Sequence, residues 1–115
     1  MTTHDVRRAV EETVAAAAER VPGVAALTPR LSRLLGGTRH RVRTAGGPAP
    51  VPGVHARLDA GRRTWQIEVR VSTVSGHRAL DVTRAVRAAA AEAARGVLEG
   101  TGEAAAVTVT VTALV

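Results

Sequence analysis

The chain has 115 residues and no cysteine, so it can form one domain with a modest core but no disulfide and no thiolate metal site. All 16 of its Lys+Arg residues are arginine, and against 10 acidic residues they give a formal net charge of +6, which favours anionic partners. The charged start is unlike a secretory signal, and the longest apolar run, Val14 to Ala18, is too short to span a bilayer. We therefore expect a cytoplasmic protein.

The first helix is predicted from apolar residues that recur at spacings of three or four: Val6, Val10, Val14, Ala17 and Val21. Asp5 or Thr3 can cap its start, and the Pro-Gly pair at 22–23 ends it. Glu11 and the other charged residues of this helix are expected on its solvent side. A short strand should follow at 24–27.

A strongly basic segment occupies the middle of the chain. It carries five arginines: Arg30, Arg33, Arg39, Arg41 and Arg43. No acidic residue occurs between Glu19 and Asp59. Residues 38–44 could form an edge strand or a loop, and the prolines and glycines of residues 45–53 predict a loop. We expect a basic Gly/Pro-rich loop at about 29–53 whose arginines reach solvent and bind an acidic protein, lipid headgroups or phosphates. The alternative is a loop that only keeps the protein soluble.

Two stretches with alternating apolar and polar residues, at 54–60 and 65–74, should form a β-hairpin. Their apolar sides coincide if Leu58 pairs with Trp65. The same register sets His55 opposite Glu68. The intervening Gly-Arg pair at 61–62 is suited to a two-residue type II′ turn.

A second, alanine-rich helix is predicted after Gly76, with an inner stripe of Val82, Val86, Ala89, Ala93 and Val97. A Gly-Thr-Gly break at 100–102 ends it, and another alternating strand follows at 107–115. A strand, a helix and a second, parallel strand place the helix across one face of a sheet.

The predicted fold class is therefore α+β, with two main helices packed on one face of a mixed β-sheet in the order α-β-(β)-β-β-α-β. The bracketed strand is the optional one at 38–44. The inward sides of the best-defined elements predict a core of Trp65, Ile67, Val69, Val82, Val86, Val109 and Val111.

Residues able to carry catalysis or to bind a metal are few. The four histidines lie on separate predicted elements without an i, i+4 pair, and neither Gly-Gly pair is followed by Lys-Ser or Lys-Thr as in a phosphate loop. His55 with Glu68, and Asp59 nearby, is the best acid/base group, but an ordinary cross-strand pair explains it as well. We therefore predict a protein that is not an enzyme, with no catalytic, metal or cofactor site.

The positive charge also fits a nucleic-acid-binding module, which is the alternative function. The chain has one tryptophan, no tyrosine and no phenylalanine, so a sheet face that stacks bases is not expected. An anionic lipid surface needs no stacking residues and would be served by the same arginines. A second candidate contact surface is the polar side of the hairpin: His55, Arg57, Glu68 and Arg70. Alanine-rich helices and unpaired sheet edges also predict a homo-oligomer.

Several short motifs, taken in order, resemble the alkaline shock protein family of envelope stress response proteins. They are PGVAAL after the first helix, VPGV at the start of a strand, LDVTRAVR in the second helix, and GTG before VTVTV. The resemblance covers nearly the whole chain and implies a single domain over residues 1–115 without catalysis. It also implies self-association and recruitment to the periphery of the inner membrane by a membrane-anchored protein partner. The chain departs from the family's pattern at Ser75, in the loop at 45–53 and in its basic charge.

Overall fold

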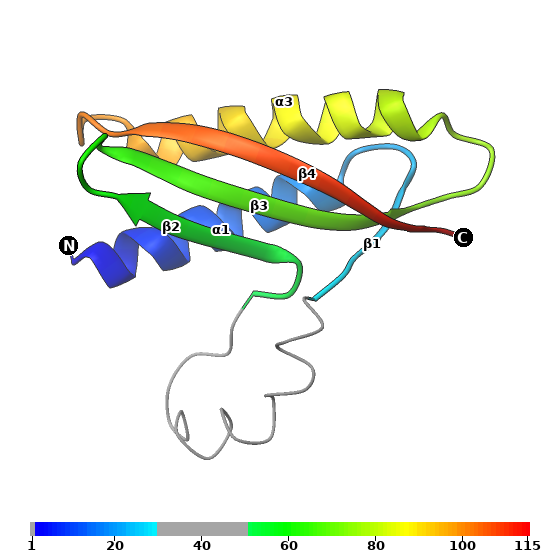
Figure 1. The fold of residues 1–115 in the computed structure, drawn as a ribbon, viewed down its shortest axis with the longest axis horizontal. Helices are drawn as coiled ribbons and strands as arrows, with labels where there is room; N and C mark the ends of the chain where they lie inside the picture. Colours follow the sequence, from blue (N-terminus) through cyan, green and yellow to red (C-terminus); the bar gives the residue numbers. More distant parts are fainter. Residues whose placement is uncertain (1, 30–50) are drawn as a thin grey trace, which may run out of the picture.

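The computed structural model describes residues 2–29 and 51–115 of the chain. Its elements are helix α1 (Thr3–Glu19), strands β1 (Val24–Leu27), β2 (Val54–Asp59) and β3 (Thr64–Thr73), helix α3 (Ala79–Leu98) and strand β4 (Ala104–Leu114). This order, α-β-β-β-α-β, confirms the predicted α+β class (Figure 1). The optional strand at 38–44 lies outside the described residues.

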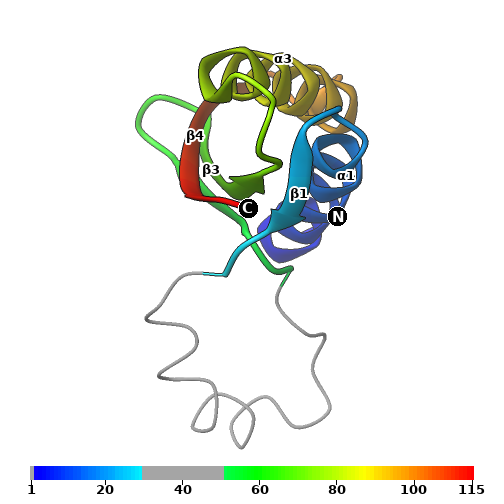
Figure 2. The ribbon, with the colours of Figure 1, turned by 90° about the vertical axis from the view of Figure 1, so that its right-hand side faces the viewer.

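Strand β3 is the centre of a mixed four-stranded sheet. Along one side it pairs in parallel with β4, and along the other it pairs antiparallel with β2 and then with the short β1. The hairpin of β2 and β3 has the predicted register, with Leu58 opposite Trp65 and His55 opposite Glu68. Both helices lie against the same face of the sheet, and no helix of the described residues covers the opposite face (Figures 1 and 2).

The turn between β2 and β3 is longer than predicted. Residues 60–63 lie outside the paired strands, so the turn has four residues where two were expected. Its left-handed residue is Arg63, with a φ of 52°, and not Gly61. The guanidinium of Arg63 donates to the C=O of Thr101 at 2.9 Å. This contact with the turn before β4 favours the longer loop.

The core lies between the helices and the sheet. Five of its predicted members are each at most 3% exposed: Trp65, Ile67, Val69, Val82 and Val86. The prediction is wrong for Val109 and Val111, which are only half-buried. Both belong to β4, which among the described strands has a partner on one side only. Edge position alone does not explain this, because Val54 and Ala56 of the edge strand β2, which α1 covers, are at most 1% exposed.

Helix α3 buries a different stripe from the predicted one. Its buried residues recur every four positions: Val82, Val86, Ala90, Ala94 and Leu98. The predicted Ala89, Ala93 and Val97 are half-buried on the flank of this stripe. Four consecutive alanines at 88–91 contain no polar residue that would indicate which of them faces the sheet, so the sequence pattern is ambiguous there.

Helix α1 is capped by Thr2 and not by the predicted residues. The Thr2 hydroxyl accepts the N–H of Asp5, and the Asp5 carboxylate accepts the N–H of Thr2, both at 3.1 Å. Hydrogen bonds from the backbone and then the side chain of Thr2 lower the pKa of Asp5 below its usual value. The buried side of α1 includes Glu11, Ala15 and Ala18, which the predicted stripe did not contain.

Candidate functional site

The five arginines predicted to contact an anionic partner lie outside the described residues: Arg30, Arg33, Arg39, Arg41 and Arg43. The structure shows where the two ends of their segment meet. The C=O of Arg70 in β3 accepts the N–H of Thr28 at 2.9 Å, and the N–H of Arg70 donates to the C=O of Gly53 at 2.8 Å. Thr28 and Gly53, the described residues on either side of the segment, are therefore both bonded to one residue of the central strand β3, whose place is shown in Figure 1.

The close approach of these two ends requires a glycine at position 53. Gly53 has a φ of +76°, in the left-handed region that favours glycine. A Cβ on Gly53 would lie 2.7 Å from the Cβ of Leu27 and 2.9 Å from the backbone nitrogen of Thr28. Any larger residue would push the two ends apart. Gly53, at the predicted end of the loop, therefore has a backbone position that its contacts with Leu27 and Thr28 define.

The second predicted surface lies on the sheet face that the helices leave open: His55, Arg57, Glu68 and Arg70. Three of these residues, with Gln66 and Thr108, line a shallow depression of about 250 Å³. Arg70 belongs to this face and also anchors both ends of the arginine-rich segment. The flanks of the arginine-rich segment, Thr28 and Gly53, are therefore bonded to a residue of the second predicted surface.

Arg70 has a donor that no residue in the described part of the chain satisfies. Its Nε is shielded from solvent and makes no hydrogen bond there. Leaving a buried donor unsatisfied costs about 1–3 kcal/mol, and more if the group is charged.

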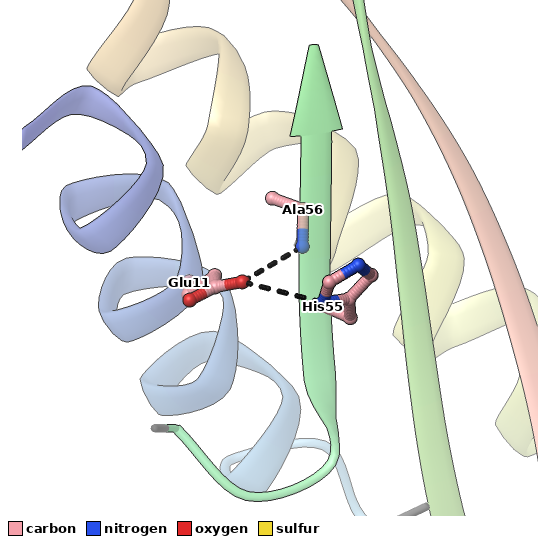
Figure 3. Close-up of polar contacts among 3 residues, drawn as sticks. All are labelled: Glu11, His55 and Ala56. Atoms are coloured by element: carbon pink, nitrogen blue, oxygen red, sulfur yellow. Dashed lines mark hydrogen bonds and ion pairs between the residues drawn. The ribbon is translucent and has the colours of Figure 1, made fainter. Parts of the chain in front are cut away.

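A carboxylate that the sequence places in solvent closes the outer edge of β2. Glu11 of α1 is 8% exposed, and its Oε2 accepts the backbone N–H of Ala56 at 2.8 Å (Figure 3). The same oxygen lies 4.0 Å from Nδ1 of the half-buried His55. The expected solvent position of Glu11 is therefore wrong. Its carboxylate serves a strand amide that faces away from β3, and it approaches His55 from the helix side.

A weak signal for the burial of Glu11 exists in the sequence. Ala15 and Ala18 follow it by four and seven residues, and both are buried. A stripe that counts alanine together with valine would place Glu11 on the buried side of the helix. Its bonding partner could not be found in this way, because Ala56 is 45 residues away in the chain.

The excess positive charge is concentrated in the arginine-rich segment. Five of the 16 arginines lie within 30–43, and all 10 acidic residues lie elsewhere. The rest of the chain therefore holds eleven arginines and ten acids, a formal net charge of +1 against +6 for the whole. The fold is nearly neutral apart from the segment whose ends Arg70 holds.

Within residues 2–29 and 51–115, no group of three or more His, Cys, Asp or Glu side chains is placed to bind a metal ion. No helix there combines the length and the apolar character that a membrane span needs. Comparison of the chain with models of protein families, with curated proteins and with solved structures gives no match.

Proposed function

We propose that this chain is a non-enzymatic interaction protein that self-associates and binds an anionic partner through its arginine-rich segment. The observation that carries the proposal is the separation of charge. Five of the six net positive charges lie within 30–43, and the ends of that segment meet on the backbone of one residue, Arg70. A charged segment attached at one fixed point can contact a partner without disturbing the core.

The open sheet face beside the segment supports the same function. It presents Arg57 and Arg70 next to His55. An acidic protein surface can contact the segment and this face together, because both meet at Arg70. Complementary charges of this kind mainly increase the association rate and fix the orientation of the partner.

The cellular setting of the proposal comes from the resemblance to the alkaline shock protein family. In that setting the protein is cytoplasmic, and a membrane-anchored protein recruits it to the periphery of the inner membrane. Anionic lipid headgroups would strengthen recruitment through the same arginines.

A nucleic-acid-binding function is the competing hypothesis, because phosphates attract the same arginines. The chain's one aromatic residue, Trp65, is buried, and its indole N–H donates to Glu103 at 3.0 Å. It cannot stack on a base, so binding would rely on phosphate contacts alone. An acidic protein partner is therefore the better supported hypothesis.

A charge-reversal variant tests the proposal. Wild type and the triple variant Arg39→Glu, Arg41→Glu, Arg43→Glu are used to capture partners from cells, with half of each lysate treated with nuclease. We expect the variant to capture membrane-associated protein at about one tenth of the wild-type amount or less. Capture by the wild type should weaken with added salt and should be unaffected by nuclease. The thermal melt should be unchanged, because the core formed by residues 2–29 and 51–115 contains no arginine.

The matched control reverses three exposed arginines of α3: Arg84→Glu, Arg87→Glu, Arg95→Glu. It changes the net charge by the same amount and should retain capture. Equal loss in both variants would show a response to net charge alone and contradict the proposal. Loss of wild-type capture after nuclease would instead support the nucleic-acid-binding module.

A further inference from the structure

The outer edge of β4 is unprotected. The strand spans Ala104–Leu114, and no strand of the described residues pairs with its outer side. From residue 104 to residue 115 the chain has no charged residue, no proline and no glycine. Soluble proteins usually protect such edges with charges, prolines or a covering element, because unpaired edges bind other strands. The two ends of the arginine-rich segment lie across β3 from this edge.

Four residues direct their backbone groups outward along this edge. The N–H of Ala104 donates to the C=O of Arg63, just before β3, at 3.0 Å, so Ala104 faces β3. Successive residues of a strand direct their N–H and C=O groups to opposite sides. The outward-facing residues are therefore Ala105, Val107, Val109 and Val111. A β-bulge after Val111 interrupts the pattern.

We infer that a second copy of this chain pairs with this edge, β4 against β4, antiparallel about a two-fold axis at Thr108. In this register Val107 bonds to Val109 of the second copy, and Ala105 bonds to Val111 of the second copy. All four outward residues of each copy are then paired, and no other antiparallel register achieves this. Thr108 lies opposite Thr108 of the second copy. The inference rests on the self-association proposed above and assigns it to a surface.

The composition of the strand favours a second copy over an unrelated extended chain. A two-fold axis brings like side chains together, so any charge near the axis would face a like charge across the strands. The strand has no charge, although the chain as a whole carries +6. Next to the axis the pairing sets Val107 against Val109 on the helix side, and at the axis it sets Thr108 against Thr108 on the open side, where the two hydroxyls can bond to each other.

Cross-linking tests the position of the axis. The chain has no cysteine, so Thr108→Cys introduces a single thiol. Directly opposed residues of a non-hydrogen-bonded pair have Cα atoms about 4.5 Å apart, within disulfide range. We expect this variant to form a covalent dimer under mild oxidation. In the control Thr110→Cys, the two thiols lie four residues apart along the strands, about 13 Å, and should stay free.

A charged variant tests the edge itself. By sedimentation velocity the wild type should have twice the monomer mass of 11.9 kDa. Thr108→Lys sets two ammonium groups opposite each other at the axis and should raise the dissociation constant of the dimer about tenfold or more. Thr13→Lys, on the exposed side of α1, is the matched control and should leave the constant unchanged.

The outcomes separate this inference from the proposed function. If the dissociation constant of the dimer is unchanged in Thr108→Lys, or if the dimer of Thr108→Cys does not cross-link, the assignment to β4 is overturned. The proposal of self-association would then still stand. A wild type that stays monomeric at millimolar concentration overturns both. Cross-linking of Thr108→Cys only to other proteins would show that the edge binds a foreign strand, which also contradicts the second copy.

Discussion

The two outer edges of the sheet differ in how their backbone groups are satisfied. At the β2 edge, α1 lies alongside, and Glu11 accepts the outward N–H of Ala56 (Figure 3). The β2 strand itself carries the charges of Arg57 and Asp59. At the β4 edge, the outward groups between residues 105 and 111 have no strand partner among the described residues, and the strand has no charge. Helix α1 covers the β2 edge and accepts one of its outward amides, whereas no described element covers the outward groups of the β4 edge.

This difference indicates separate roles for the two edges. Burying the carboxylate of Glu11 costs desolvation energy, which its bond to a strand amide and its approach to His55 offset. The β2 edge is thus covered at the cost of burying a carboxylate, whereas the outer side of the longer strand β4 has no covering element among the described residues. This difference is why we propose β4, and not β2, as the edge that pairs with a second copy.

The largest loss of stability is expected at Ile67, in the central strand β3 that lies between the two edges. Ile67→Ala should lower the free energy of unfolding by about 3 kcal/mol, because this side chain is buried in the central strand. Val109→Ala on the open edge should cost about 1 kcal/mol, and Thr110→Ala less than about 0.5 kcal/mol. Chemical denaturation at low protein concentration measures the three values in the monomer. Equal losses at all three positions would contradict both the facing of the strands and the edge position of β4.

Opening the closed edge should have a smaller effect. Glu11→Leu leaves the N–H of Ala56 buried without an acceptor and should lower the free energy of unfolding by about 2 kcal/mol. Glu11→Gln keeps an acceptor within reach and should cost less than half as much. Glu12→Gln, at an exposed position of the same helix, controls for the loss of one negative charge. If Glu11→Leu is as stable as the wild type, Glu11 does not stabilise the β2 edge.

Local periodicity is sufficient to predict most of the fold. The alternation of the two hairpin strands excludes a one-residue slip, and the short connection at 60–63 favours the register that pairs Leu58 with Trp65, which the structure has. The same alternation places His55 and Glu68 together on the polar face. The strand, helix and strand at the C-terminal end of the chain likewise predict the mixed sheet.

The order of the strands cannot be predicted in this way. Val69 and Val109 have the same alternating surroundings, yet Val69 is fully buried and Val109 is half-buried. The position of each strand in the sheet and the helix that covers it decide this, and both depend on contacts between distant parts of the chain. The bond of Glu11 to Ala56 and the meeting of Thr28 with Gly53 at Arg70 are non-local in the same sense.

Residue-resolved amide hydrogen exchange tests the contrast between the two edges most directly. In dilute monomer the amide of Ala56 should be protected, while those of Val107 and Val109 should exchange rapidly and that of Thr108, which faces β3, slowly. As the protein concentration rises, Val107 and Val109 should become protected and Ala56 should not change. Protection of Val109 in the dilute monomer, or rapid exchange of Ala56, would contradict the assignment of a closed edge at β2 and an open edge at β4.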